Sequence, residues 1–298
     1  LHLNTGNNKP VFYHQYPLPR YYHDAVEKQI TEWSEHSVIV PAPENCPWNS
    51  PLLCVPKKDS DGKLTAVRVC LDPRSINAIL EDDVYPIPPV LDIIEQIVGF
   101  KIASSLDLAW SFNQILVAKK DQPKLCFTWH GKRWMFCGAP FGIKTVPSHM
   151  QRLLNRLLHQ LRDITCHYLD DSLVHTHTDS IADHICDLRL VLTEINKAAL
   201  CLCVKKCHFG YRRIRMVGYI ASADGYAPDL KKLSTFQTMP TPTTGKQVQS
   251  FLGFANFLQL FVPRYACLTA PLDALCHISD VHPFWTKDCQ ASVDALRR

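Results

Sequence analysis

Two adjacent carboxylates, Asp170 and Asp171, stand in the stretch HYLDDSLVHT at residues 167–176. Short apolar runs of strand-like composition flank the pair, which places it at the tip of a predicted β-hairpin. Aspartate is favoured in turns because its side chain hydrogen-bonds nearby backbone, so the pair alone fits an ordinary turn. Two carboxylates on a rigid tip could instead bind a divalent metal ion. A metal site requires a further acid nearby, which only another element of the fold can supply.

The elements that follow residue 100 decide where such an acid could lie. The predicted order is a strand at 102–108, a hairpin at 125–137, a helix at 147–162, the acidic hairpin, a helix at 181–195 and a strand at 200–204. With the 125–137 hairpin set aside as an insertion, this order is β-α-β-β-α-β, the split βαβ arrangement. Two right-handed crossovers place its first and third strands side by side and antiparallel, with both helices on one face.

Asp107 lies at the carboxyl end of the first of these strands, and Asp170 and Asp171 lie on the turn beside it. Three carboxylates in one place repel one another and raise their own pKa values, so a bound cation is expected. Few hard oxygen ligands suit Mg²⁺, which keeps positions open for substrate phosphates, and Mn²⁺ could replace it. Two such ions serve nucleotidyl transfer: one activates a 3′-hydroxyl and the other stabilises the leaving pyrophosphate.

Composition sets broad limits on the class of protein. The chain has 298 residues, 46% hydrophobic and 20% charged, as in ordinary globular proteins. No apolar stretch approaches the ~18 residues of a membrane-spanning helix, and no basic and apolar leader follows Leu1, so no membrane association is expected. The net charge of +4 permits a polyanionic partner.

Cysteine usage indicates an intracellular protein. The 13 cysteines are scattered through apolar patterns, which is typical of reduced thiols. The group Cys201, Cys203, Cys207 and His208 could suggest structural zinc, but its CxC spacing and the lack of a second ligand pair disfavour that reading.

Three blocks now identify a family resemblance. YLDD at 168–171, SSLDLAWSFNQI at 104–115 and APFGIKTVP at 139–147 resemble the reverse transcriptase of gypsy-class long-terminal-repeat retrotransposons. Further blocks, among them CPWNSPLLCVPKKD, RVCLDPRSIN and PTPTTGKQVQSFLGFANF, follow the order of that family. A lone YxDD would be weak evidence, whereas seven or more ordered blocks make chance similarity very unlikely.

The resemblance implies an α+β fold, the right-hand polymerase of fingers, palm and thumb with a split βαβ palm sheet. The expected division is an extended lead-in at 1–23, fingers at 24–99, palm at 100–228 with a fingers hairpin at about 119–140, and thumb with the start of the connection at 229–298. The implied activity is RNA- and DNA-templated DNA synthesis from dNTPs on a primed template. RNase H and integrase regions are expected in a longer polyprotein.

The resemblance also assigns roles to residues. The catalytic acids fall on Asp107, Asp170 and Asp171, and the Leu108 carbonyl is a further metal ligand. Phe112 is the steric gate against a 2′-hydroxyl, and Phe141 lines the nucleotide pocket. The other expected contacts are triphosphate contacts by Arg68 and by one of Lys57 and Lys58, a primer grip at Met216, Val217 and Gly218, and a thumb track along the duplex at Gln249, Gly253 and Phe257.

Two other functions stay open at this stage. Ala109, Ala139, Gln259 and Leu260 depart from the family's pattern, which favours a decayed or co-opted copy that only binds nucleic acid. A nucleotide cyclase on another split βαβ scaffold would also use paired metals, but it would not need the thumb blocks. The sequence leaves open the oligomeric state, and it does not distinguish a cytoplasmic particle from the nucleus.

Overall fold

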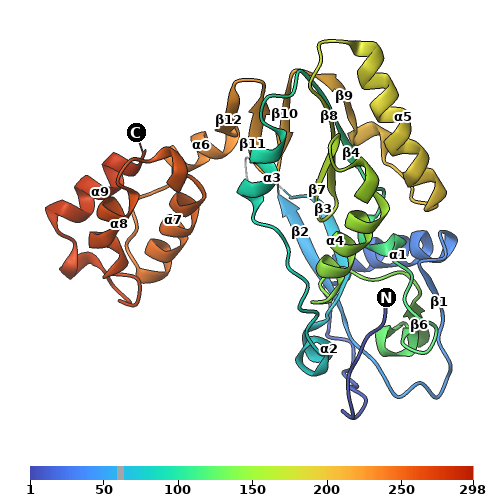
Figure 1. Cartoon of the computed structure of the whole chain (residues 1–298). Coiled ribbons are helices and arrows are strands. Elements are labelled where there is room, and N and C mark those ends of the chain that lie inside the picture. Colours follow the sequence, from blue (N-terminus) through green and yellow to red (C-terminus); the bar gives the residue numbers. More distant parts are fainter. Residues whose placement is uncertain (59–63, 298) are drawn as a thin grey trace. The chain divides into compact units, whose positions relative to one another are not determined.

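The computed structural model describes residues 1–58 and 64–297 (Figure 1). The chain divides into two compact units, Leu1–Ile214 and Arg215–Arg298. This division falls earlier in the chain than the predicted palm–thumb boundary at 228/229. The finer division into fingers, palm and thumb stays a prediction.

The elements of each unit follow in chain order. The helices of the first unit are α1 (His23–Glu35), α2 (Arg74–Ile79), α3 (Val90–Ile97), α4 (Val146–Leu157) and α5 (Ile181–Lys197). Its strands are β1 (Ile39–Pro41), β2 (Leu52–Lys58), β3 (Leu64–Leu71), β4 (Ile102–Asp107), β5 (Cys126–Trp129), β6 (Lys132–Phe136), β7 (Thr165–Tyr168), β8 (Asp171–Thr176) and β9 (His208–Tyr211). Strand β10 (Arg213–Met216) leads into the second unit, which has β11 (Tyr219–Ser222), β12 (Gly225–Pro228), α6 (Leu230–Gln237), α7 (Gly245–Phe257), α8 (Tyr265–Asp273) and α9 (Lys287–Arg297).

A four-stranded sheet in the order β7-β8-β4-β9 forms the centre of the first unit. Strands β4 and β8 are neighbours and antiparallel, as the split βαβ arrangement predicts. The prediction of a fourth strand at 200–204 is wrong, because β9 at His208–Tyr211 pairs with β4 instead. Leu202 makes a single bridge to Leu108, and the chain then turns through a short 3₁₀ helix at Val204–Lys206. Val204 is 69% exposed, so the alternation of LCLCV does not mark a strand with a buried face.

The two faces of this sheet differ in what covers them. Leu106 of β4 and Val174 of β8 belong to one apolar cluster with Leu158, at the end of α4, and Val191 of α5. Both crossover helices therefore pack on this face, as predicted. Since neighbouring residues in a strand point to opposite faces, Asp107 lies on the other face of the sheet.

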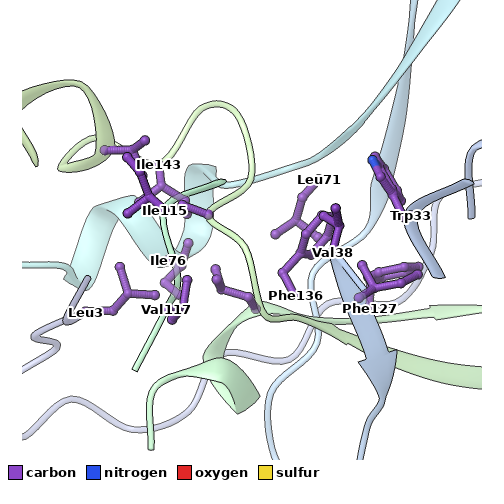
Figure 2. Close-up of a cluster of buried hydrophobic side chains, with 14 of the residues drawn as sticks. Leu3, Trp33, Val38, Leu71, Ile76, Ile115, Val117, Phe127, Phe136 and Ile143 are labelled. Atoms are coloured by element: carbon purple, nitrogen blue, oxygen red, sulfur yellow. The ribbon is translucent and has the colours of Figure 1, made fainter. Parts of the chain in front are cut away.

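The main core of the first unit lies outside that sheet (Figure 2). Val26, Ile30 and Trp33 form the predicted apolar stripe of α1, and all three are buried. Trp33 packs edge-on against Phe127 and Phe136 of the β5–β6 hairpin, with ring centroids 6.3 and 5.0 Å away. This aromatic cluster joins α1 to the predicted fingers hairpin.

The second unit is built around α7. Its apolar face is buried through Val248, Phe251, Leu252 and Ala255. The side chain of Thr244 accepts a hydrogen bond from the Gln247 N–H, which is half of a capping box. In the other half of this motif, the Gln247 side chain accepts a hydrogen bond from the Thr243 N–H, at 2.7 Å, instead of from the Thr244 N–H. Among the residues described, no helix is long and apolar enough to cross a membrane.

Two histidines, the half-buried His167 and the buried His175, make stability depend on pH. Burial lowers the pKa of His167 and of His175 from 6.5 to about 4. The unfolded chain therefore binds protons before the folded chain does, so this contribution to stability is complete above about pH 6.5 and is lost as the pH falls toward 4. We expect the urea midpoint of unfolding to fall between pH 6.5 and 5, and to fall less in His175→Phe. A midpoint that is flat over this window would contradict the prediction.

Candidate active site

The three predicted acids lie at one end of the central sheet. Asp107 is the last residue of β4 and stands directly opposite Asp171, the first residue of β8. Asp170 occupies the two-residue turn between β7 and β8, because Tyr168 pairs with Asp171. Strand register thus brings together carboxylates that are far apart in the chain.

Electrostatics at this position favour a cation. The pKa of Asp171 is raised by burial and further by the charges of Asp170 and Asp107. Lys206 supplies partial compensation, with its Nζ 3.3 Å from Asp107 Oδ1, and Ser111 Oγ donates to Asp170 Oδ2 at 3.2 Å. Within the described residues, no three His, Cys, Asp or Glu side chains already surround one metal position. The carboxylates thus interact electrostatically without forming a closed ligand set.

The Leu108 carbonyl is also available as a ligand. Leu108 and Leu202 form an antiparallel bridge. Its two hydrogen bonds run from Ala109 N–H to the Cys201 carbonyl and from Cys203 N–H to the Asp107 carbonyl. The Leu108 carbonyl takes no part in them, so four hard oxygen donors of the kind that suits Mg²⁺ lie near one another.

A cavity of about 330 Å³ adjoins the acids. The predicted site residues in its lining are Lys57, Arg68, Asp107, Leu108, Phe141 and Asp170. The Arg68 guanidinium lies 6.0 Å from the centre of the Phe141 ring. Phe112, the predicted steric gate, is half-buried with its ring 5.1 Å from that of Phe141, and it is not among the residues that line the cavity. Lys58 ends β2, and its side chain lies outside the described part of the chain.

Trp110 and Lys206 are among the cavity residues that sequence reasoning missed. Trp110 has φ 48°, is 42% exposed and packs edge-on against His36 at 4.3 Å. No local sequence pattern predicts a positive φ at a tryptophan. Lys206 follows the supposed strand at 200–204 and is the first residue of KCHFG at 206–210, a further block that follows the family's order. The block includes the residue but does not predict its contact with Asp107.

The predicted primer grip forms a tight turn in the second unit. Val217 and Gly218 both have positive φ, 48° and 88°, as in the type I′ turns that favour glycine. A Cβ on Gly218 would lie 2.1 Å from Lys232 Nζ, the end of a flexible side chain that can move, so it is the positive φ that favours glycine here. Met216, just before the turn, is buried.

The predicted thumb track is partly engaged in contacts of its own unit. The Gln249 amide donates to the Cys276 carbonyl at 2.8 Å. Lys232 Nζ lies 4.0 Å from the centre of the Phe257 ring, and the Tyr219 ring packs against the same side chain at 4.5 Å. Gly253 is exposed, and a Cβ there would meet nothing within 4 Å. Gln249 and Gly253 are both exposed, and Phe257 is half-buried.

The family is decided by comparison with known sequences. The sequence model described as "Reverse transcriptase (RNA-dependent DNA polymerase)" matches residues 55–221. The chain belongs to the reverse transcriptase family. The matched range contains the acidic sheet end of this reverse transcriptase domain and all the predicted site residues that line the cavity.

Relatives confirm a retrotransposon origin. The domain is 32% identical over 274 residues to the Retrovirus-related Pol polyprotein from transposon opus of Drosophila melanogaster, covering 92% of this chain and 27% of the relative. It is 28% identical over 297 residues to the Transposon Tf2-3 polyprotein of Schizosaccharomyces pombe, covering 99% and 21%. The chain thus spans only about a quarter of these polyproteins, and membership of the gypsy class stays a prediction.

Solved structures confirm the α+β polymerase fold. The foamy viral protease-reverse transcriptase in complex with dsDNA has a TM-score of 0.84 and 25% identity, over 98% of this chain and 60% of that one. The same viral protein in complex with an RNA/DNA hybrid gives a TM-score of 0.84 at 23% identity, over 99% and 39%. Both of these neighbours hold nucleic acid duplexes.

Proposed function

We propose that this reverse transcriptase domain adds dNTPs to a primer 3′-hydroxyl on an RNA or DNA template, using two Mg²⁺ ions. The observation that carries the proposal is the pairing of Asp107 with Asp171 beside Asp170, at the mouth of a cavity that Arg68 also lines. Anionic ligands for a metal and a cation for phosphates then lie in one site, which suits phosphoryl chemistry.

The metal ligands proposed are the carboxylates of Asp107, Asp170 and Asp171 and the Leu108 carbonyl. Burial raises the pKa of Asp171, and the charges of Asp170 and Asp107 raise it further; divalent charge would relieve this repulsion. Bound Mg²⁺ would supply an activated 3′-hydroxyl and charge neutralisation on the phosphates, and Mn²⁺ could replace it. The chain's own role is to hold these oxygens in place on a paired sheet end.

The nucleotide would lie in the cavity. Arg68 presents a planar guanidinium suited to bidentate contact with the triphosphate, and Lys57 adds a second cation. Lys58 shares this proposed role. Phe141, beneath Arg68, would contact the nucleotide, and Phe112 behind it would limit the space beside C2′, which distinguishes dNTPs from rNTPs.

The second unit would bind the primed template. Val217 and Gly218 would contact the primer through the backbone of their turn, with Met216 buried behind it. Gly253 would permit close approach of the duplex, with Phe257 beside it. Contact by Gln249 would require its amide to leave the Cys276 carbonyl. RNase H and integrase activities would belong to other parts of the polyprotein.

Single-nucleotide extension of a DNA primer on an RNA template tests this proposal. At low salt we expect extension with Mg²⁺ or Mn²⁺ and none after chelation with EDTA, since metal removal leaves the carboxylates uncompensated. Restored Mg²⁺ should restore extension, and Ca²⁺ is the control for non-productive binding. Extension that persists in EDTA would contradict the metal assignment. Duplex binding without extension under any metal would instead support the alternative function, a decayed or co-opted copy that only binds nucleic acid.

A further inference from the structure

Gln151 lies on α4 and is only 1% exposed, with its amide directed at the acidic hairpin. Its Oε1 accepts the N–H of Leu169 at 2.8 Å, and its Nε2 donates to the His167 carbonyl at 3.2 Å. These two hydrogen bonds fix the backbone on both sides of Tyr168, immediately before Asp170. One buried amide therefore links the crossover helix to the carboxylate turn.

The turn needs such support because of its conformation. Leu169 is the first of its two central residues and has φ 56°. A side chain with a Cβ rarely adopts this left-handed region, and glycine is the residue that two-residue turns usually place there. The Leu169 N–H bond to Gln151 stabilises the turn from outside, so the sequence can dispense with glycine at this position.

Neighbouring side chains hold the Gln151 amide itself. Asn155, one turn further along α4, has its Oδ1 3.3 Å from Gln151 Nε2 and 2.6 Å from His167 Nε2. His167 Nδ1 is buried without a hydrogen-bond partner in the described residues, and burial lowers the pKa of His167 to about 4. The ring is therefore neutral near pH 7 with its hydrogen on Nε2, which donates to Asn155. Asn155 Nδ2 in turn donates to the Tyr85 hydroxyl at 2.6 Å.

We propose that Gln151 is a positioning residue, which holds the strained Leu169 turn so that the carboxylates of Asp170 and Asp171 are preorganised for their metal ions. The inference rests on the proposed function. Gln151 itself touches neither metal nor substrate. Outer groups of this kind orient the ligands and typically change metal affinity or rate by about 10–100-fold.

The first test is Gln151→Leu, which removes both hydrogen bonds at similar volume. We expect kcat for single-nucleotide incorporation to fall about 10–100-fold, with the KM for dNTP and the Kd for primed template within about twofold. Gln160→Leu is the matched control, because Gln160 is an exposed glutamine just beyond the same helix, and its kcat should not change. A folded Gln151→Leu protein with the native kcat would overturn the proposal.

A rescue variant separates this role from simple loss of packing. Glycine adopts positive φ without steric cost, so Leu169→Gly should make the turn less dependent on Gln151. In the Gln151→Leu background we expect Leu169→Gly to recover at least about fivefold in kcat, whereas alone it should change kcat less than about threefold. If Leu169→Gly restores no activity, Gln151 does not act by stabilising the positive φ of Leu169.

Mn²⁺ binding, followed by electron paramagnetic resonance, gives a readout that does not require catalysis. Gln151→Leu should bind Mn²⁺ about tenfold more weakly than the native chain. If the native chain extends no primer, the proposed function fails, while the Mn²⁺ comparison still decides the role of Gln151. If Gln151→Leu does not fold, Gln151→Met replaces it, because it keeps an unbranched side chain of similar volume and loses both the acceptor for Leu169 and the donor to His167. Native Mn²⁺ affinity in that variant would overturn the inference.

Discussion

Asp170→Asn should lower the rate of single-nucleotide incorporation by at least about 10³-fold, or about 4 kcal/mol in the activation free energy. The amide keeps the shape of the side chain and its contact with Ser111, but it loses the charge that a divalent ion requires. Asp107→Asn should have an effect of the same order. Steady-state incorporation on a primed RNA template measures both losses, and circular dichroism checks that the fold is retained.

Asp179→Asn is the matched control for these variants. Its carboxylate is 63% exposed and pairs with Arg212 on the surface of the same unit. Incorporation should stay within about twofold of the native rate, since an exposed ion pair contributes little. Native incorporation by folded Asp107→Asn or Asp170→Asn would refute the metal assignment at Asp107, Asp170 and Asp171.

Phe127→Ala should destabilise the first unit by about 3–5 kcal/mol, which is a large share of the ordinary stability of a domain. The ring is fully buried and packs against Trp33 and Phe136, so its removal leaves a cavity that is lined in part by α1 and β6 (Figure 2). Urea unfolding followed by tryptophan fluorescence measures this loss.

An exposed phenylalanine provides the comparison. Phe209 of β9 is 44% exposed, and Phe209→Ala should cost less than about 1 kcal/mol. Equal losses in the two variants would show that the aromatic cluster between α1 and the hairpin does not form as described.

The order of elements in the central sheet could be predicted because hydrophobic periodicity and chain handedness are local or general rules. Those rules put Asp107 next to the acidic hairpin, and register does place it opposite Asp171. The strand at 200–204 was mispredicted because alternation alone does not show whether a segment has a paired neighbour. Leu202 finds one bridge, and Val204 faces solvent.

Contacts between distant residues could not be predicted. Lys206 contacts Asp107 across 99 positions of sequence, and the exposed Gln249 donates a hydrogen bond to the Cys276 carbonyl. Neither contact can be predicted from hydrophobic periodicity, because each depends on the side-chain conformations in the packed structure. The family resemblance named the right regions without these partners.

The register between β4 and β8 also restricts which length changes the gene can tolerate. Because side chains alternate between the faces of a strand, loss of one codon within either strand would turn one of the paired acids toward the face that α4 and α5 cover. The same loss in an exposed hairpin turn, such as His130–Gly131, would leave that pairing unchanged. Among copies of a mobile element that accumulates insertions and deletions, the intact length of β4 and β8 is therefore a better sign of a functional copy than overall sequence similarity.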